Sequence, residues 1–486
     1  MKTIVLFSRC ELANLYGRIS EKLSSEHTVI HIAFSDVEKR ILEKKYNIKK
    51  VINFSAEITK LHLNESVNLD YCKLIDEVII EQSLGRFNLN SAIQYDRTFQ
   101  YQSLDASLIL CQIYYKFWSQ LIEHEKVDFV VHEPTSLFLN QISALICKKN
   151  NAKYLTQILV YGQDEFNFIT VSGDDCRFDK ILNSKSRSGI KDKKFDNAIK
   201  FLTDFRGDFN TFVDSYNKNR SFGTLLSNTV KSIGKYIKYS TKLKMTEFTE
   251  LDHIEYYHYR DFSLLSSLKN DWGQYFLLNY DTFDESLNYF YYPMHLEPEA
   301  VVLYWGDGIY KDQIKLIENI AAQLPPGHYL YVKDHPHAGA YRSVDDYKKL
   351  RSIPNIKLLN PSVQGKKVIL KSKGVITING TSGFEALLLN KQVYVFGNSF
   401  YDSCERVNKI EHIREFRSVV YSNYQNVYQD DDALIGFVSD FLSSSHRGFT
   451  DYFIDYVKRV GIDEEKNAVM VSQELLEYFS HSNQSD

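Results

Sequence analysis

The chain has 486 residues, more than one hydrophobic core usually accommodates, so its length predicts two domains. Hydrophobic residues make up 44% of the chain and charged residues 25%, a balance that argues against wholesale disorder. The formal net charge of −4 argues against a nucleic-acid binder that works through bulk positive charge, and we expect no nucleic-acid partner.

The six cysteines are scattered and form no CxxC pair, so the sequence predicts neither a zinc site nor a disulfide framework. Isolated cysteines among apolar neighbours suit a reducing compartment. The first apolar run, Thr3–Phe7, is too short for the core of a signal peptide. No window approaches the roughly 20 apolar residues of a membrane span. We therefore expect a cytoplasmic protein.

Strand-like and helical segments alternate through the first part of the chain. The predicted elements, in chain order, are a strand at Thr3–Ser8, a helix at Leu12–Glu26, a strand at Thr28–Phe34, a helix at Asp36–Tyr46, a strand at Val51–Phe54, mostly helical residues over 55–125, a strand at Val127–Val131, a helix at Ser136–Lys149 and a strand at Tyr154–Ile158. Alternation with short connections predicts a parallel sheet covered by helices.

Residues 165–285 are rich in Lys, Asn, Ser and Asp and predict an insertion of helices and loops. The alternation then returns, with strands at Tyr289–Pro293, Tyr329–Lys333, Ile356–Leu359, Gly374–Ile378 and Gln392–Phe396 and helices at Lys311–Gln323, Gly365–Ser372 and Ser382–Leu389. This pattern predicts a second doubly wound unit. We expect a first Rossmann-like domain over 1–285, a second over 286–445, and C-terminal helices over 446–486.

Ligands of open parallel sheets bind beyond the carboxyl ends of the strands. The first candidate there is the segment Lys333–His337, which follows a predicted strand. Pro336 ends the strand and aims His335 out of the sheet edge. A histidine in that place can hydrogen-bond a phosphate or donate a proton to it. The alternative is a surface turn that contains two histidines.

The second candidate is a turn of small residues between a strand and a helix. The helix N-terminus offers unpaired N–H groups and the positive end of a dipole, which together form a phosphate cradle. The alternative is a plain helix cap, since Ser and Thr are common in caps. Glu385, one turn into the helix, is placed to accept hydrogen bonds from ribose hydroxyls. The candidate donor-binding residues of this turn are Asn379, Gly380, Thr381, Ser382, Gly383 and Glu385.

Two further loops follow strands of the second unit. His295, Glu297 and Glu299 bring a histidine and two carboxylates to the expected mouth of a cleft between the domains, and they are also candidate donor-binding residues. A solvated loop is the alternative. The loop Gly397–Asp402 holds an aromatic pair that either lines a base or sugar pocket or packs at the edge of the core.

In the first unit, Glu133 lies in the turn after the predicted strand Val127–Val131. A carboxylate at a strand end that faces the expected cleft could take the proton of an incoming hydroxyl as a general base. The alternative is an acidic residue at the start of a helix beside Pro134.

Together, these segments resemble the capsule polysaccharide biosynthesis family over roughly residues 288–403. The segments that carry the resemblance are YYPMHLEPEA, DQIKLIENIAAQLPPGHYLYVKDHPH, IPNIKLLNPS and GVITINGTSGFEALLLNKQVYVFGNSFYD. The resemblance implies a GT-B glycosyltransferase fold, with two Rossmann-like domains that face a cleft. Members include transferases of Kdo and other nonulosonic acids with CMP-activated donors. A histidine–proline motif, shared with several bacterial sialyltransferase families, contacts the CMP phosphate there; it corresponds to His335 and Pro336.

This resemblance implies an inverting transferase whose donor is a CMP-sugar and whose acceptor is a glycan or lipid-linked glycan. The sequence has no DxD pair of the kind that holds a metal-bound diphosphate, so we expect neither a metal nor another cofactor. His335 and Glu133 are the candidate catalytic residues.

Three alternatives remain open. The donor could be a UDP- or GDP-sugar, the chain could be a non-catalytic component of capsule export or assembly, or it could be a nucleotide-sugar epimerase. An epimerase should act on its substrate without an acceptor, whereas a scaffold would not need intact phosphate-binding motifs.

The segment Lys218–Met245 is basic and has no acidic residue. Its cationic residues are Lys218, Arg220, Lys231, Lys235, Lys238, Lys242 and Lys244, and its apolar residues at near-helical spacing are Leu225, Leu226, Val230, Ile233 and Ile237. Such a helix can lie on an anionic membrane surface. The alternative is a helix packed on the protein with its lysines solvated. Gly223 and Gly234, which weaken an isolated helix, favour this alternative.

Overall fold

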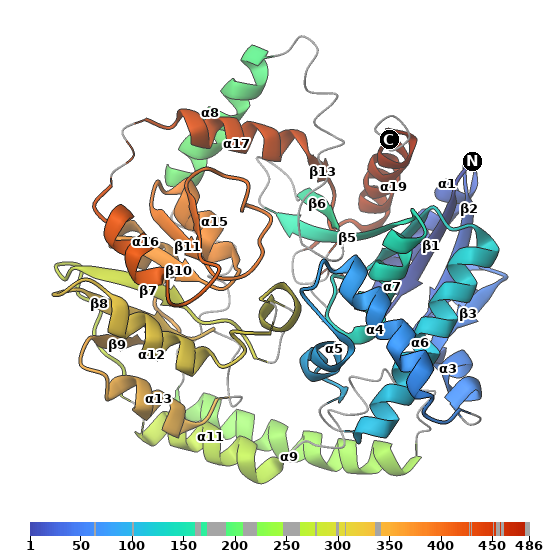
Figure 1. Ribbon diagram of the computed structural model, residues 1–486, viewed down its shortest axis with the longest axis horizontal. Coiled ribbons are helices and arrows are strands. Elements are labelled where there is room, and N and C mark those ends of the chain that lie inside the picture. Colours follow the sequence, from blue (N-terminus) through green and yellow to red (C-terminus); the bar gives the residue numbers. More distant parts are fainter. Residues whose placement is uncertain are drawn as a thin grey trace. The chain divides into compact units, whose positions relative to one another are not determined.

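The structure is a computed structural model with two compact units. It describes residues 1–62, 65–99, 102–160, 167–172, 191–207, 221–245, 263–277, 279–297, 301–306, 308–335, 342–426, 428, 430–450, 452, 457 and 461–481. Unit 1 comprises Met1–Ile190, Lys242–Asp261 and Asp440–Asp486, and unit 2 comprises Lys191–Thr241 and Phe262–Ser439. Each unit is an α/β layer structure around its own sheet (Figure 1).

The strands of the unit 1 sheet, from edge to edge, are β13 (Ser445–Arg447), β6 (Asn167–Ser172), β5 (Lys153–Val160), β4 (Phe129–His132), β1 (Thr3–Ser8), β2 (Thr28–Ala33) and β3 (Val51–Asn53). The strands from β5 to β3 are parallel, whereas β6 runs antiparallel to both β5 and β13. The order β3-β2-β1-β4-β5 is that of a Rossmann-like sheet.

Side chains of β1 alternate between two cores, because successive residues of a strand point to opposite faces. Ile4 and Leu6 pack with α1 (Leu12–Ser24) and α19 (Glu464–His481). Val5 and Phe7 pack on the other face. The helices that contribute to that second core are α3 (Phe54–His62), α4 (Leu69–Gln82), α5 (Leu89–Tyr95), α6 (Leu104–Glu125) and α7 (Phe138–Lys149). Helices therefore cover both faces of the sheet, as a parallel sheet requires.

Capping residues in the sequence determine both ends of α2 (Asp36–Tyr46), the helix that follows β2. The helix begins with a capping box in which Ser35 and Glu38 each bind the other's backbone N–H. It ends at Asn47, whose φ of 58° lies in the left-handed region that asparagine tolerates.

The sheet of unit 2 has the described strand order β12 (Val407–Lys409), β11 (Gln392–Val395), β10 (Gly374–Thr377), β7 (Tyr289–Pro293), β8 (Tyr329–Lys333) and β9 (Ile356–Leu359). All of these pairings are parallel. In chain order the strands read 3-2-1-4-5-6 from β9 to β12, which is the order of a dinucleotide-binding sheet. The order reverses between β7 and β10, and this reversal marks the place where ligands of such sheets bind.

Helices also cover both faces of the unit 2 sheet. On one face, apolar residues of α12 (Gln313–Gln323), α13 (Val344–Arg351) and α16 (Phe416–Asn423) join the strands in a single core. On the other face lie α14 (Gly365–Lys371) and α15 (Thr381–Leu388), whose buried residues include Val368, Ala386 and Leu387. The remaining described helices are α8 (Lys191–Gly207), α9 (Phe222–Met245), α11 (Leu264–Leu277), α17 (Asp432–Ser443) and a π-helical turn at Val301–Trp305.

The predicted α/β class with two Rossmann-like sheets is confirmed. The division of the chain differs from the expected boundaries at 285 and 445. Residues 191–241 group with unit 2, and residues 440–486 group with unit 1 because α19 packs against α1. The expected helical insertion over 165–285 also begins with a strand, β6, which pairs with β5 and β13.

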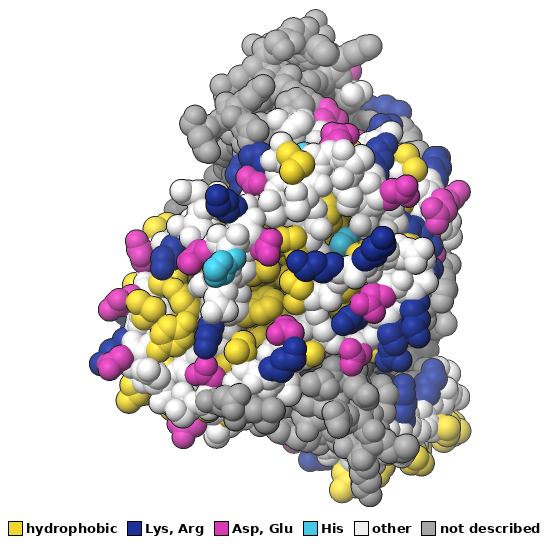
Figure 2. Space-filling model, turned by 90° about the vertical axis from the view of Figure 1, so that its right-hand side faces the viewer, with side chains coloured by type: hydrophobic (Ala, Val, Ile, Leu, Met, Phe, Trp, Pro, Cys, Tyr) yellow, Lys and Arg dark blue, Asp and Glu magenta, His cyan; other side chains and the backbone are white. Residues whose placement is uncertain are grey.

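On the face drawn in Figure 2, lysine and arginine side chains are mixed with aspartate and glutamate. No broad region of a single sign covers that face, which agrees with the small formal net charge of −4.

Candidate active site

The loops that follow β7, β8 and β10 meet at one edge of the unit 2 sheet, because parallel strands all end there. His295 and Glu297 follow β7, Asp334 and His335 follow β8, and Asn379 follows β10. These residues occupy the point where the strand order reverses, so three of the sequence-predicted segments converge on the expected ligand edge.

His295 lies at the centre of this edge. Its ring Nε2 is 3.1 Å from Thr377 Oγ1 and 3.4 Å from the backbone N–H of Asn379, so it joins the loop after β7 to the end of β10. Burial, together with the nearby His335 and Arg342, lowers the pKa of His295 to about 3. The imidazole is therefore neutral at physiological pH and acts as a hydrogen-bond partner, not as a positive charge.

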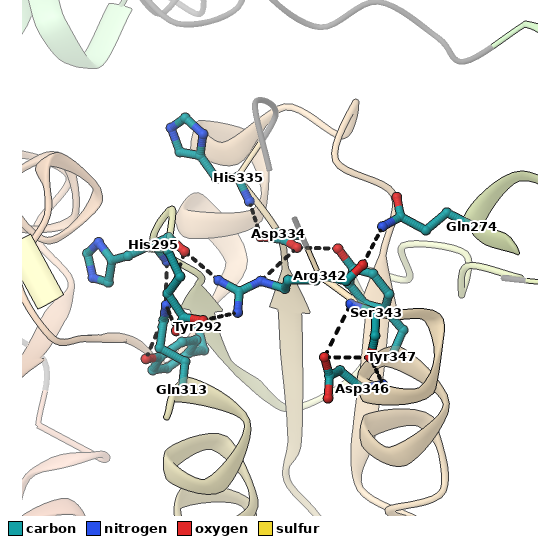
Figure 3. A network of polar contacts seen from close by, with 11 residues as sticks. Gln274, Tyr292, His295, Gln313, Asp334, His335, Arg342, Ser343, Asp346 and Tyr347 are labelled. Carbon is teal, nitrogen blue, oxygen red and sulfur yellow. Dashed lines mark hydrogen bonds and ion pairs between the residues drawn. The ribbon is translucent and has the colours of Figure 1, made fainter. Parts of the chain in front are cut away.

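Arg342 holds the loop after β7 against the loop after β8 (Figure 3). Its Nε donates to Asp334 Oδ2 at 3.0 Å, and its Nη1 donates to Glu297 Oε2 at 2.8 Å. The third donor, Nη2, binds the backbone carbonyl of His295 at 2.5 Å. The planar guanidinium suits three acceptors in fixed directions, which the point charge of a lysine does not match.

The charges of this network are largely buried. Burial opposes the charged form of Arg342, but the carboxylates of Asp334 and Glu297 outweigh it and raise the pKa of the guanidinium. Burial raises the pKa of Glu297 in spite of Arg342. Tyr347 adds a hydrogen bond from its hydroxyl to Asp334. The result is a charged network in which each carboxylate has a partner.

Gln313 and Gln274 support the network from the neighbouring helices. The amide oxygen of Gln313 accepts the N–H of His295 at 2.8 Å, and its amide nitrogen donates to His295 O at 3.0 Å. Gln274 of α11 donates to the carbonyl of Arg342 at 2.9 Å. The backbone of both loops is therefore fixed by side chains of α12 and α11.

Replacing Arg342 by methionine should destabilise the protein by about 3–5 kcal/mol, because it leaves the buried carboxylates of Asp334 and Glu297 without a cation. Urea denaturation would measure the change. The matched control is Arg351→Met, which removes an exposed guanidinium 3.9 Å from Asp281 and should cost below about 1 kcal/mol. Equal losses for the two variants would contradict the structural role of Arg342.

His335 differs from the buried residues around it. Its backbone N–H donates to Asp334 Oδ1 at 2.7 Å, which fixes the start of the loop. Its half-exposed ring points away from the Arg342 network (Figure 3). This is the direction expected of a side chain that meets a ligand beyond the sheet edge. Pro336 and Glu299, the other predicted residues of these loops, lie outside the described residues.

The N-terminus of α15 has no side-chain cap. Gly380 occupies the N-cap position in an extended conformation and makes no side-chain cap hydrogen bond. Thr381 is exposed and Ser382 is half-exposed. Neither Thr381 nor Ser382 is therefore the N-cap residue, and the phosphate-binding role of this turn stays a prediction.

Packing also explains the two glycines of this turn. A Cβ at Gly380 would come within 2.8 Å of His295 Cε1, and a Cβ at Gly383 within 2.3 Å of the Tyr401 hydroxyl. The Tyr401 hydroxyl donates to Gly380 O at 2.7 Å and accepts from Gly380 N at 3.3 Å. Glycine is thus required at both positions by neighbouring side chains, whether or not a ligand approaches the backbone.

Asn379 and Glu385 are turned inward. The Asn379 amide donates to Asn398 O, which connects the loops after β10 and β11. Glu385 is buried in the layer between α15 and the sheet. The pKa of the buried Tyr291 is raised mainly by its burial. The nearby charge of Glu385 raises it further. The ribose-binding role of Glu385 stays a prediction.

In unit 1, Glu133 follows β4 at the matching reversal point, between β1 and β4. Arg9, which follows β1, donates from Nη1 to both carboxylate oxygens of Glu133, at 2.7 and 3.0 Å. Both side chains are buried, and the hydroxyl of Ser136 is 3.5 Å from Glu133 Oε1. Glu133 is thus a buried carboxylate with a bound cation, and its role as a base stays a prediction.

Sequence patterns did not indicate Arg342, Gln313 or Arg9, whereas Tyr401 belongs to the aromatic pair noted in the loop Gly397–Asp402. Arg342 lies eight residues after Asp334, and no local pattern shows that the chain returns there. Arg9 had a usable signal, since the ends of strands 1 and 4 are neighbours in any Rossmann-like sheet. Within the part of the chain that the structure describes, no group of three or more His, Cys, Asp or Glu residues could hold a metal ion.

Residues 215–431 match the family model described as "Capsule polysaccharide biosynthesis protein". No curated protein matches the chain. Solved structures similar to the chain include UDP-GlcNAc 2-epimerase from Methanocaldococcus jannaschii, with 12% identity, a TM-score of 0.27, and coverage of 88% of this chain and 93% of that one.

Two Thermosulfurimonas dismutans KpsC structures are also similar. The beta Kdo 2,4 transferase has 11% identity, a TM-score of 0.30, and coverage of 66% of this chain and 82% of its own. The beta Kdo 2,7 transferase has 10% identity and a TM-score of 0.31, and the match covers 97% of this chain and 99% of that one. TM-scores of this size do not establish shared chemistry.

Proposed function

We propose that the chain is a glycosyltransferase of capsule or related surface-polysaccharide synthesis, because residues 215–431 match the family model of capsule polysaccharide biosynthesis proteins. The donor is a CMP-activated nonulosonic acid of the Kdo, sialic or pseudaminic type, and the acceptor is a glycan or lipid-linked glycan. The reaction inverts the anomeric configuration and needs no metal.

One observation carries this proposal: the uncapped N-terminus of α15 lies beside His295, at the point where the strand order of the unit 2 sheet reverses. A helix N-terminus in that place attracts a phosphate through its N–H groups and its dipole. Thr381 and Ser382 add hydroxyl donors that the protein itself does not use for capping.

The proposed chemistry is a single displacement. An acceptor hydroxyl attacks the anomeric carbon, its proton passes to Glu133, and the bond between that carbon and the phosphate oxygen of CMP breaks. His335 and the first turn of α15 stabilise the charge that develops on the leaving phosphate. His295 is neutral, so it orients the Asn379 backbone and leaves the charged role to other groups.

A thermal-shift panel with CMP, UDP and GDP tests the donor class. Ligand that binds only the native state raises the melting temperature by mass action, and at a hundred times its Kd the added stability is about 2.7 kcal/mol. We expect CMP to give the largest shift. A larger shift with UDP or GDP would replace the CMP donor, and no shift with any nucleotide would favour a non-catalytic role in export or assembly.

The variant Thr381→Val/Ser382→Val should lose most of the CMP shift, because valine keeps the helix but offers no hydroxyl donor. Calorimetric titration with CMP would measure the loss. The control Ser418→Val/Ser422→Val changes two exposed serines of α16 in the same unit and should keep wild-type affinity. Unchanged nucleotide affinity in the first variant would remove the phosphate role of the turn.

A nucleotide-sugar epimerase is the other catalytic possibility. It converts its substrate in the absence of an acceptor, whereas a transferase consumes donor only when an acceptor hydroxyl is present. Incubation of the protein with the donor alone, followed by chromatography of the sugars, distinguishes the two reactions.

A further inference from the structure

Helices α9 and α11 lie side by side (Figure 1), and side chains of the two helices are in contact. Across the described residues, no helix is long and apolar enough to cross a membrane.

One side of α9 packs on the protein. Leu225, Ser232 and Tyr239 recur every seven residues and are buried. The indole N–H of Trp272 in α11 donates to Thr229 Oγ1 at 3.0 Å. Leu225, which the sequence pattern placed in the apolar stripe, thus belongs to the packed side. The contact with α11 fixes which sides of α9 remain exposed.

A second side of α9 carries a stripe of exposed apolar residues. They are between 41% and 69% exposed, and spacings of three and four residues place them along one face. The residues of this apolar stripe are Phe222, Leu226, Val230, Ile233 and Ile237. Single exposed apolar residues are ordinary, but a contiguous row of them marks an interaction surface.

The stripe continues onto α11. The ring of Phe222 lies 6.4 Å from Trp272, and Trp272 stacks on Phe276 at 5.7 Å. Phe276 and Leu265 of α11 are exposed as well. Apolar side chains of two helices therefore form one surface.

Among the described residues of α9 and α11, the exposed charged side chains are all lysines. Lys231, Lys235 and Lys238 are exposed on the remaining side of α9, and Lys269 is exposed on α11. Helix α9 contains no acidic residue, and Asp271 of α11 is buried. The predicted cations Lys218 and Arg220 lie outside the described residues.

We propose that the apolar stripe of α9, with its lysines, binds the surface of an anionic lipid bilayer. Apolar residues insert into the boundary between headgroups and acyl chains, while lysines attract the anionic headgroups. A second copy of the stripe would bring the lysines of α9 toward the same lysines of its partner, and α9 itself has no acidic residue to pair them.

Co-sedimentation with liposomes tests the proposal. The full chain should bind vesicles of phosphatidylglycerol and phosphatidylcholine and not vesicles of phosphatidylcholine alone, and binding should weaken as salt is raised. The variant Lys231→Glu/Lys235→Glu/Lys238→Glu should bind at least tenfold less. Val230→Ser/Ile237→Ser, which keeps every charge, should lose a similar amount.

The matched control is Lys44→Glu/Lys49→Glu/Lys50→Glu, which makes the same charge change at exposed lysines of unit 1 and should bind within twofold of wild type. Circular dichroism confirms that each variant is folded. Equal sedimentation with both kinds of vesicle, none with either, or an equal loss in the control would overturn the proposal. A dimer in sedimentation velocity that Val230→Ser/Ile237→Ser breaks into monomers would also overturn the proposal. No nucleotide enters the assay, so its outcome does not depend on the proposed reaction.

Discussion

Replacing His335 by alanine should lower the rate of sugar transfer by about a hundredfold or more, the usual scale for loss of an acid–base or oxyanion partner. The half-exposed ring points away from the Arg342 network, so its removal should leave the fold intact. Steady-state kinetics with the CMP-sugar donor measures the effect, which should fall on kcat more than on KM. Loss of a proton donor should also change the pH profile of kcat.

The control for His335 is His412→Ala, which removes another exposed histidine of unit 2 and should retain wild-type turnover. Wild-type turnover in His335→Ala would remove the proposed role. His295 could not then take over a charged role, because burial keeps its pKa at about 3.

Replacing Glu133 by glutamine should abolish most turnover while nucleotide binding persists, since only the proton acceptor is lost. A second effect follows from the ion pair with Arg9. The buried guanidinium is left without its carboxylate, which should destabilise the protein by about 3–5 kcal/mol. Denaturation and single-turnover kinetics on the same preparation separate the two effects.

The double variant Arg9→Gln/Glu133→Gln distinguishes a base from a structural partner. It removes both charges, so it should regain stability relative to Glu133→Gln alone. If Glu133 is the base, turnover stays lost in the double variant. Recovery of turnover together with stability would show that the pair is structural. Activity in the single variant would move the base to Glu297 or Glu299.

The strands of unit 2 were predictable because their signal is local. Runs of aromatic and branched apolar residues predicted Tyr289–Pro293, Tyr329–Lys333 and Ile356–Leu359, and the structure has these bounds. Strands that depend on distant partners were not predictable in this way. β13 has three residues and pairs with β6, almost 280 positions earlier, so its own sequence carries little pattern.

The part of the site that could be predicted is the set of residues that directly follow predicted strands. The chain order of strands and helices indicated that His295, His335 and Asn379 would meet at one edge. It did not indicate what joins them, because the directions of a guanidinium's three hydrogen bonds depend on tertiary packing. Likewise, the turn Gly380–Gly383 indicated a phosphate cradle, but the side chains of His295 and Tyr401 that require its glycines come from other loops.

The discontinuity of unit 1 has a consequence for how the chain is made. A ribosome completes residues 1–190 well before it reaches β13 and α19 of the same unit. At about 5–20 residues per second, residues 191–439 take on the order of 10–50 s to synthesise. Until then, the apolar face of α1 lacks the helix that covers it, so a nascent first unit should be a client of chaperones that bind exposed apolar surface.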